Sequence, residues 1–569
     1  MRRNMVVFIL GAFVLIACQA VIQTSKNYAV DGQPTSSITP SFTYPAETIF
    51  PTPPAAISSE TPTSIPEKPC KVIFHPDNGL YVGDQVSIEV LAPKNKHLND
   101  NLVQISVLSP VSVTLPTAKI SPFGLGERYE ANLTWAWDTR GLSPGDYTLN
   151  FSVQPYGKVW TETVSLQPAE DLPVNEIGAH WTTEESDCCL VYYITNTASA
   201  RDIGKLLDLL DEQAEIVSRQ MQAEFSMPVT VAFIPRVLGH GGFTASEISV
   251  SYLDRNYTGD AIAMILRHEM VHLMDNQLGG NLRPTMLVEG LAVYISGGHF
   301  KPEPLLSRAA ALLDHELYIP LSQLIDDFYK TQHETGYLEA GALVQFMVEK
   351  YGWHDFSSFY RDIHPAPNEG KQSAAIDIAL QKHFKLSLDD LEQEFITTLR
   401  SQKAPPDSIV EIQRTVAYYD TVRRYQKMLD NSAYFLNAWI LNGKEMRQRG
   451  IVADYMRHPN DLINLVLETM LQDAGENLHN SDYAKADQLI SSVKWALDAV
   501  ERGEADPFSV SRQVKDVYTV IQIITRMGFE PQRVQWNEDR IQVWASQSGM
   551  LLQEFAFLPE GSTWVLAAE

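Results

Sequence analysis

The chain has 569 residues, which is long enough for three or four domains. Its 70 acidic residues outnumber its 44 lysines and arginines, and the net charge of −26 argues against a nucleic-acid-binding protein, which needs a basic surface. Four cysteines are too few for a scaffold held together by disulfides. We therefore expect a multidomain globular protein whose partners do not include nucleic acid.

The first 68 residues have the features of an export signal followed by a tether. A basic start precedes an apolar run at 5–17 that is too short to span a membrane comfortably. The run ends in Leu-Ile-Ala-Cys, which resembles the lipobox of bacterial lipoproteins and implies a signal peptide at 1–18 with lipid attachment at Cys18. An ordinary secretory signal or an N-terminal anchor is the alternative. Residues 19–68 are rich in Pro, Ser and Thr and should stay extended. We expect an extracytoplasmic, lipid-anchored protein at the bacterial cell surface.

Residues 69–170 are predicted to form a β-domain. Apolar and polar side chains alternate at 85–90 and 103–107, and turn residues separate these runs. The stretch 137–151 is typical of a hairpin and resembles the later strands of bacterial immunoglobulin-like domains, which implies a β-sandwich. The domain has no cluster of catalytic residue types, so spacing is a better prediction for it than binding. Its one cysteine could bridge to one of a later adjacent pair and fasten this domain to the next; these cysteines are Cys70, Cys188 and Cys189.

Residues 171–403 combine strands with helices and are predicted to form an α+β domain. Apolar runs predict strands at 190–194, 229–234 and 247–253. Ser199 and Asp202 have the spacing of a capping box for a long helix that runs to residue 224.

A His-Glu-x-x-His motif lies in this domain, at His268, Glu269 and His272. Histidines four positions apart lie on one face of an α-helix, so both imidazoles can reach the same metal ion. Glu269 can take a proton from a water at the open position of that ion, as a general base. A second helix begins near Pro284 and carries Glu289. Because a catalytic zinc usually takes three protein ligands, Glu289 is the candidate third ligand.

The motif and the later Leu-x-Glu-Gly-x-Ala-x-Tyr sequence resemble the gluzincins, the thermolysin-like and aminopeptidase N-like branch of zinc peptidases. They are most similar to the peptidase MA group of secreted bacterial proteins. The resemblance implies zinc held by the two histidines and Glu289, with Glu269 as the base. Thermolysin-like members carry an aspartate four residues after the third ligand, but Val293 stands there in this chain. Asp275 is therefore a candidate to orient the first histidine, although a polar residue near a helix end explains it equally well.

Substrate contacts are predicted just before the motif helix. In gluzincins an edge strand at this place pairs with the substrate backbone, and here the place is taken by residues 239–243 and the strand after them. Gly241 and Gly242 would let a peptide backbone approach closely, and a plain glycine-rich turn is the alternative. The Gly-x-Met-Glu-Asn segment that holds the free amino end in aminopeptidase N-like members does not occur here.

Related peptidases place a tyrosine or histidine further along the chain, where it donates a hydrogen bond to the oxyanion of the tetrahedral intermediate. Tyr337 is the first candidate for this role, His333 the second and Tyr294 the third. Packing of the aromatic rings, or a surface position for the histidine, is the alternative for each.

A pair of prolines at 405–406 marks the start of a separate region, residues 404–569. Amphipathic patterns predict helices, for example at 409–429 and 484–499, and alternation between 534 and 557 predicts a small β-meander. No motif assigns a function to this mainly helical region, and packing or substrate positioning is expected.

These features together predict a cell-surface zinc metallopeptidase that hydrolyses peptide bonds in peptides or proteins. One alternative is a surface binding or adhesion protein that retains a non-catalytic metal site, but the four intact motif residues argue against it. Another is a zinc hydrolase that acts on a non-peptide amide. The motif does not distinguish this activity from hydrolysis of a peptide bond. The spacing by itself also permits divalent ions other than zinc.

Overall fold

The structure is a computed structural model. It describes residues 68–94, 98–110, 112–126, 128–226, 228–239, 241–259, 261–299, 301–313, 316–367, 370–437, 439, 441–547, 551–561 and 563–567. The predicted signal peptide, the lipidation site Cys18 and nearly all of the predicted linker lie outside the described residues. Among the helices that are described, none has the length and apolar character needed to cross a membrane.

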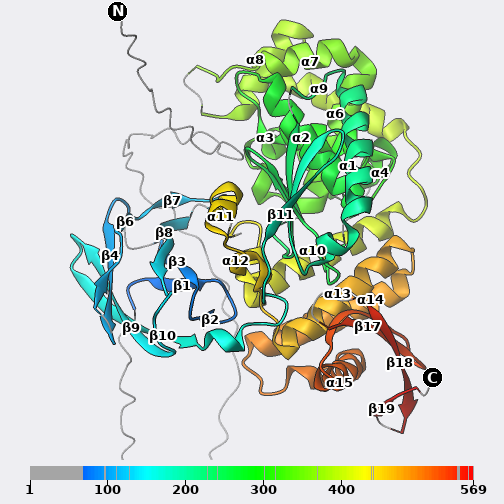
Figure 1. Cartoon of the computed structure of the whole chain (residues 1–569). Coiled ribbons are helices and arrows are strands. Elements are labelled where there is room, and N and C mark those ends of the chain that lie inside the picture. The colour runs from blue at the N-terminus through cyan, green and yellow to red at the C-terminus, as the bar shows by residue number, and fades with distance from the viewer. Residues whose placement is uncertain are drawn as a thin grey trace, which may run out of the picture.

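The N-terminal region consists of two sheets that share one hydrophobic core (Figure 1, blue and cyan). One sheet has the strand order β1-β3-β8-β7, and the other has the order β2-β10-β9-β4-β5 with β6 paired to β4. The predicted alternation at 85–90 and 103–107 lies in β3 and β4. The strands are β1 (Lys71–His75), β2 (Leu80–Tyr81), β3 (Gln85–Ala92), β4 (Leu102–Ser109), β5 (Val113–Thr114), β6 (Ala118–Lys119), β7 (Ser121–Phe123), β8 (Arg128–Asp138), β9 (Gly145–Gln154) and β10 (Lys158–Gln167).

The middle region contains a mixed sheet with the order β11-β12-β13-β15-β14. The three inner strands run parallel, whereas β11 and β14 pair antiparallel at the two edges. β12 and β13 are largely apolar, as expected for parallel strands that are covered on both faces, whereas β15 alternates Ile248 and Val250 with two buried serines. They coincide with the three predicted strands within a few residues. The bounds are β11 (Trp181–Glu185), β12 (Cys189–Ile194), β13 (Val229–Ile234), β14 (Gly242–Thr244) and β15 (Ile248–Ser251).

Helices surround this sheet, and the first of them begins differently from the prediction. Its N-cap is Thr197, and Ser199 lies inside the first turn with its hydroxyl 2.9 Å from that of Thr197. Asp202 pairs with Arg201. The predicted capping box is therefore wrong, because the chain becomes helical one residue before Ser199. The helices are α1 (Ala198–Met221), α2 (Ile262–Leu278), α3 (Thr285–Ser296), α4 (Leu305–Leu313), α5 (Leu321–Asp326), η2 (Phe328–Lys330), α6 (His333–Tyr351), α7 (Trp353–Arg361), α8 (Gln372–His383) and α9 (Leu388–Ser401).

Helix α3 packs unusually closely against α6. A Cβ atom at Gly290 would lie 2.6 Å from the carbonyl oxygen of Ala340, and one at Gly341 would lie 2.5 Å from Val293 Cγ1. Glycines on both helices thus bring the two backbones together. The glycine that follows Glu289 in the sequence is required by this packing, which also determines where Glu289 lies.

The C-terminal region is helical and ends in a four-stranded antiparallel meander, as predicted (Figure 1, yellow to red). Its sheet has the simple order β16-β17-β18-β19. The elements are α10 (Ser408–Leu429), η3 (Asn431–Ala433), α11 (Gly443–Arg449), α12 (Ala453–Met456), α13 (Leu462–His479), α14 (Tyr483–Glu501), η4 (Pro507–Ser509), α15 (Arg512–Arg526), β16 (Glu530–Trp536), β17 (Ile541–Ser546), β18 (Gln553–Glu560) and β19 (Thr563–Leu566).

Buried arginines join the C-terminal region to both others. Arg255, between β15 and α2, donates to Glu468 of α13 at 2.6 Å, and both side chains are almost inaccessible. Arg457, just after α12, pairs with Asp84 of the N-terminal sheets and with Glu176 at 2.6 and 2.7 Å. Helices α11 and α12 lie between the N-terminal sheets and the middle region (Figure 1). The C-terminal region therefore connects the other two.

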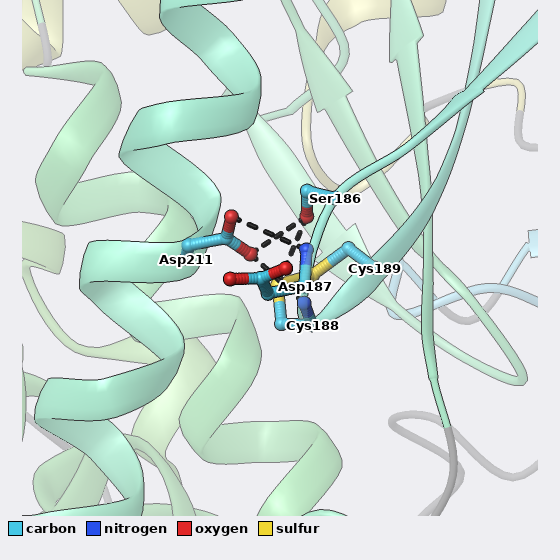
Figure 2. Close-up of a disulfide and its surroundings, with 5 residues drawn as sticks. All are labelled: Ser186, Asp187, Cys188, Cys189 and Asp211. Atoms are coloured by element: carbon cyan, nitrogen blue, oxygen red, sulfur yellow. Dashed lines mark hydrogen bonds between the residues drawn. A yellow bond between two sulfur atoms is a disulfide. The ribbon is translucent and has the colours of Figure 1, made fainter.

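The adjacent cysteines are bonded to each other rather than to the N-terminal region. Figure 2 shows the bridge between Cys188 and Cys189 at the start of β12. Asp211 of α1 accepts hydrogen bonds from the Cys188 backbone N–H at 2.9 Å and from the Ser186 hydroxyl at 2.7 Å. Cys70 is buried in the core of the N-terminal sheets. The hypothesis of a bridge from Cys70 to this pair is therefore wrong, since each of the two cysteines already bonds its neighbour.

Candidate metal centre

His268 and His272 of α2 and Glu289 of α3 converge on one point. Glu289 Oε2 lies 3.3 Å from His268 Nε2 and 3.4 Å from His272 Nε2. Ligands held about 2.1 Å from zinc in a tetrahedron stand about 3.4 Å from one another, so these separations suit ligands that share one ion. Within the described part of the chain, the three residues form one of two groups of histidine and acidic side chains with donor atoms close enough to hold a metal ion.

The helix that carries the two histidines is fixed to its neighbours by the residue before the motif. Arg267 Nε donates to Gln213 Oε1 of α1 at 2.9 Å, and its Nη1 donates to the Ser296 carbonyl of α3 at 3.4 Å. The side of α2 that faces away from the two histidines is buried in the core of the middle region through Met270 and Met274. These contacts hold α2 and α3 in the relative position that the metal ligands require.

Glu289 is oriented by a tyrosine that the sequence did not single out. The Tyr329 hydroxyl, in η2, donates to Glu289 Oε1 at 2.9 Å. One oxygen of the carboxylate therefore faces Tyr329 while the other faces the two histidines. Hydrogen bonds of this kind hold a metal-ligating carboxylate in place. No motif marks Tyr329, which lies 40 residues after its partner.

The three ligands form a charge-coupled cluster in which Glu289 is buried and the two histidines are largely buried. Burial lowers the pKa of His268 to about 4, so this ring is neutral and able to bind a metal. Burial also opposes a charge on His272, but the Glu289 carboxylate outweighs it and raises the pKa of His272 to about 9. Burial would raise the pKa of Glu289, yet the charge on His272 and hydrogen bonds from both rings hold it well below its usual range. The metal-free site is thus an ion pair between His272 and Glu289.

Glu269, the predicted base, is held by the neighbouring edge strand. Its side chain is buried, and burial raises its pKa to about 7, a value suited to a group that exchanges protons near neutral pH. The Thr244 hydroxyl donates to Glu269 Oε2 at 2.7 Å. Thr244 lies in β14 and was not identified from the sequence, because nothing local marks a threonine as the partner of a glutamate 25 residues later.

The end of the glycine-rich segment forms the edge strand β14, which packs against α2. A Cβ atom on Gly242 would lie 2.9 Å from Ile265 and 3.0 Å from Glu269, so this glycine lets the strand approach the motif helix. Gly241, with φ +92°, precedes the strand in a conformation that favours glycine. β14 pairs only with β15 in the described sheet. Its other side therefore presents backbone groups that an extended chain could pair with.

One of the three oxyanion candidates lies beside a metal ligand, and a second stacks on the first. Tyr337 is buried on α6, and its ring centroid lies 6.4 Å from that of His268. His333 stacks on Tyr337 with the centroids 4.4 Å apart. Tyr294 lies near Glu349, towards the other end of α6. The structure thus brings Tyr337 and His333 to the site and leaves Tyr294 away from it.

A second cluster, formed by His299, His333 and Glu334, adjoins the centre. Glu334 Oε1 accepts a hydrogen bond from His333 Nδ1 at 2.8 Å, and its Oε2 accepts one from His299 Nδ1 at 3.1 Å. Burial lowers the pKa of His333 to about 3. Burial would raise the pKa of Glu334, but His299 and the hydrogen bonds from both rings hold it well below its usual range. The sequence did not point to His299 or Glu334, since they belong to no spaced motif.

Asp275 contacts other groups than the metal ligands. Its buried carboxylate binds Arg283 at 2.9 Å, the Tyr360 hydroxyl at 3.0 Å and Arg361 at 2.6 Å. Among the contacts of the described residues, none joins Asp275 to His268. Asp275 therefore fixes the end of α2 to the segments around it.

The C-terminal region borders this site. The His333 ring lies 6.4 Å from Tyr419 of α10 and 5.7 Å from Phe435, centroid to centroid. Arg423 of α10 donates to the carbonyl oxygen of Gly239 at 3.1 Å, next to the edge strand. The region beyond the catalytic motif thus contributes side chains to the surroundings of the metal centre.

Comparisons with known proteins leave the family open. No family model matches the chain, and no curated protein matches it. Among solved structures, an aminopeptidase N family protein from Idiomarina loihiensis is similar at 9% identity and a TM-score of 0.19, over 66% of this chain and 78% of that one. A likeness of this size carries no argument about the fold or the activity, so the functional argument depends on the site itself.

Proposed function

We propose that the protein is a zinc-dependent peptidase of the gluzincin type that hydrolyses peptide bonds. The observation that carries this proposal is the convergence of His268, His272 and Glu289 at the separations of ligands on one tetrahedral ion. All three donors are of types that zinc prefers, and they leave a fourth position for water. When bound, zinc would polarise the scissile carbonyl and activate the attacking water.

Glu269 performs the proton transfers. It takes a proton from the attacking water and later delivers it to the leaving amine. Its pKa of about 7 allows it both to accept and to return a proton near neutral pH. The hydrogen bond from Thr244 leaves the carboxylate one fixed orientation beside the metal ligands.

The substrate backbone extends along β14. In the described sheet β14 pairs only with β15, so its other side could pair with an added strand, and this pairing would place a peptide beside the motif helix. Tyr337 is the first choice among the predicted donors to the oxyanion, since it lies closest to the first ligand. Glu269 and the metal would act on the bond held there.

We also propose that the protein acts outside the cytoplasm, at the cell surface. Lipid attachment at Cys18 would hold the enzyme at the outer face of a bacterial membrane, and residues 19–68 would act as a tether. We assign the two-sheet N-terminal region to an immunoglobulin-like spacer. The shared core of its sheets supports this assignment. Peptides or proteins outside the cytoplasm would be the substrates.

The test is metal content and turnover of the full-length chain. Elemental mass spectrometry should find one zinc per chain in the wild type and none in His272→Ala. With a peptide library as substrate, the wild type should cleave, and Glu269→Gln should keep its zinc but lose turnover. A well-folded wild type that binds no zinc would favour a surface binding protein instead. Zinc binding without cleavage of any peptide would favour a non-peptide amide as the substrate.

A further inference from the structure

The segment after β1, residues 75–78, reaches from the N-terminal region to the other two regions. The Asp77 carboxylate accepts a hydrogen bond from Arg236 Nη2 of the middle region at 2.5 Å, and this guanidinium is only 2% exposed. Next to it, Asn78 donates to Asn460 of the C-terminal region at 2.7 Å. A charge pair removed from water costs desolvation free energy, so a contact of this kind calls for a reason beyond spacing.

His75 holds this segment in one position. Its ring is 1% exposed, lies 3.4 Å from Asp77 and 3.2 Å from Glu89, and stacks on Trp439 of the C-terminal region with the centroids 4.1 Å apart. Burial would lower the pKa of His75, but the two carboxylates raise it to about 9, so the ring is a cation at neutral pH. A cation between two carboxylates and an indole face has little freedom to move. The ring therefore keeps the Asp77 carboxylate in place.

Arg236 stands two residues after β13, at the start of the connection to the edge strand β14. Its Nη1 donates to the carbonyl oxygens of Asp454 and Arg457, each at 2.9 Å, and its Nη2 donates to the Ser432 hydroxyl as well as to Asp77. The planar, fork-shaped guanidinium suits such a set of fixed acceptors. One side chain of the middle region thus binds both flanking regions.

The backbone after this arginine is fixed by two further hydrogen bonds. The Leu238 N–H donates to the Ser251 hydroxyl at 3.0 Å, and the Gly239 N–H donates to the Ala433 carbonyl oxygen at 2.9 Å. β14 begins three residues after Gly239. The place where residues 235–239 lie on the C-terminal segment therefore sets where β14 starts.

The N-terminal region also contacts the C-terminal segment at a second place. Arg128 Nη1 donates to the Leu436 carbonyl oxygen at 3.1 Å, and a Cβ atom on Gly126 would lie 2.9 Å from that oxygen. Leu436 follows Phe435, whose ring centroid lies 5.7 Å from that of His333 beside the metal centre. Two contacts thus fasten the N-terminal region to the segment that borders the site.

We propose that Asp77 and Arg236 are positioning residues for the edge strand β14, which makes the N-terminal region part of the peptidase and not only a spacer. The inference rests on the proposed function, in which β14 receives the substrate backbone. The ion pair fixes residues 235–239 against the C-terminal segment 432–436, and both residues act on the substrate through the strand. A peptide then adds to a strand that is already ordered, which lowers the entropic cost of binding.

Hydrogen exchange followed by mass spectrometry tests this in the full-length chain and needs no substrate. The variants are Asp77→Ala and Asp77→Asn, whose amide keeps an oxygen that can accept from Arg236. Asp138→Ala is the control, because Asp138 pairs with Arg140 on the exposed surface of the same region. Zinc content, KM and kcat are measured on the same proteins.

We expect peptides that cover residues 236–251 to exchange about tenfold faster in Asp77→Ala than in the wild type, since a charge-assisted hydrogen bond is lost and the strand opens locally. Asp77→Asn should lie between the two, and the control should match the wild type. Peptides from α2 should exchange equally in all four proteins, each with one zinc. With a cleaved peptide, Asp77→Ala should raise KM about tenfold and change kcat less than about twofold, because pairing with β14 binds the ground state and the transition state alike.

Three results would overturn the inference. The first is equal exchange at 236–251 in Asp77→Ala and the wild type. The second is a KM for Asp77→Ala no higher than that of the control. The third is faster exchange throughout α2 with loss of zinc in both Asp77 variants, which would show that the ion pair holds the whole fold and not the strand. A wild type that binds no zinc or cleaves no peptide would contradict the proposed function instead, and the exchange data would still decide whether the pair positions β14.

Discussion

Replacement of Gly290 by alanine tests how helix packing sets the metal site. The new Cβ would lie 2.6 Å from the Ala340 carbonyl oxygen, 2.8 Å from its carbonyl carbon and 3.1 Å from Val344 Cγ2. Two of these atoms belong to the backbone of α6, so no side-chain rotation can relieve the clash. Helix α3 must move away from α6, and Glu289, one residue earlier, must move with it.

The expected loss of stability in Gly290→Ala follows from the cost of overpacking. Forcing an extra methyl group into a packed core costs about 2 kcal/mol. This cost is larger than the gain in helix propensity of about 1 kcal/mol that alanine brings over glycine. We expect a net loss of about 1 kcal/mol, with the melting temperature of the metal-free protein about 2–4 °C lower. Zinc affinity should also fall by about tenfold, since a shift of Glu289 breaks the match between ligand separations and the ion. Thermal unfolding by circular dichroism and zinc competition with a chromophoric chelator measure the two effects.

Gly204 supplies a matched control. It lies within α1, and a Cβ there would meet no atom within 4 Å. Gly204→Ala should therefore raise the melting temperature slightly through helix propensity and leave zinc affinity unchanged. If Gly290→Ala behaved like Gly204→Ala in both assays, the close packing of α3 on α6 would not determine the position of Glu289.

Three further predictions concern protons and burial. Since the pKa of His272 is about 9 without metal and a zinc ligand must be neutral, zinc binding at pH 7 should release about one proton. Calorimetry in buffers of different ionisation enthalpy checks this, and equal heats would contradict it. Because Glu269 must be ionised to act as base and its pKa is about 7, kcat/KM should fall about tenfold per pH unit below 7; a flat profile down to pH 5 would disprove the assignment. Arg255→Met should destabilise the protein by about 3–5 kcal/mol by leaving the buried Glu468 carboxylate without its cationic partner, and Arg255→Met with Glu468→Leu should recover much of the loss in thermal unfolding. Equal stability of the single and double variants would argue against this pairing.

The sequence by itself determined those features that depend on local geometry. Two histidines four residues apart must share a helix face, so the pairing of His268 with His272 needs no knowledge of the fold. Apolar runs located β12 and β13, because strands buried on both faces are apolar along their length. Alternation with a period of two located the terminal meander, because a strand with one buried face must show it. Pro284 and the later Glu-Gly-x-Ala sequence also indicated a second helix with Glu289 on it.

Only the tertiary structure decided which distant groups meet at the site. Tyr329 reaches Glu289, and Thr244 reaches Glu269, through the packing of η2 and β14. His299 and Glu334 meet each other because α6 packs near the segment after α3. No sequence periodicity predicts such contacts, since they depend on where the loops place segments that are distant in the sequence. For the same reason the sequence did not predict which cysteines form the disulfide, because pairing depends on the distance between them after folding and not on their number. The role of Asp275 was also decided by the tertiary structure. Its buried carboxylate binds Arg283 and Arg361, which the fold brings to it from the following loop and from α7.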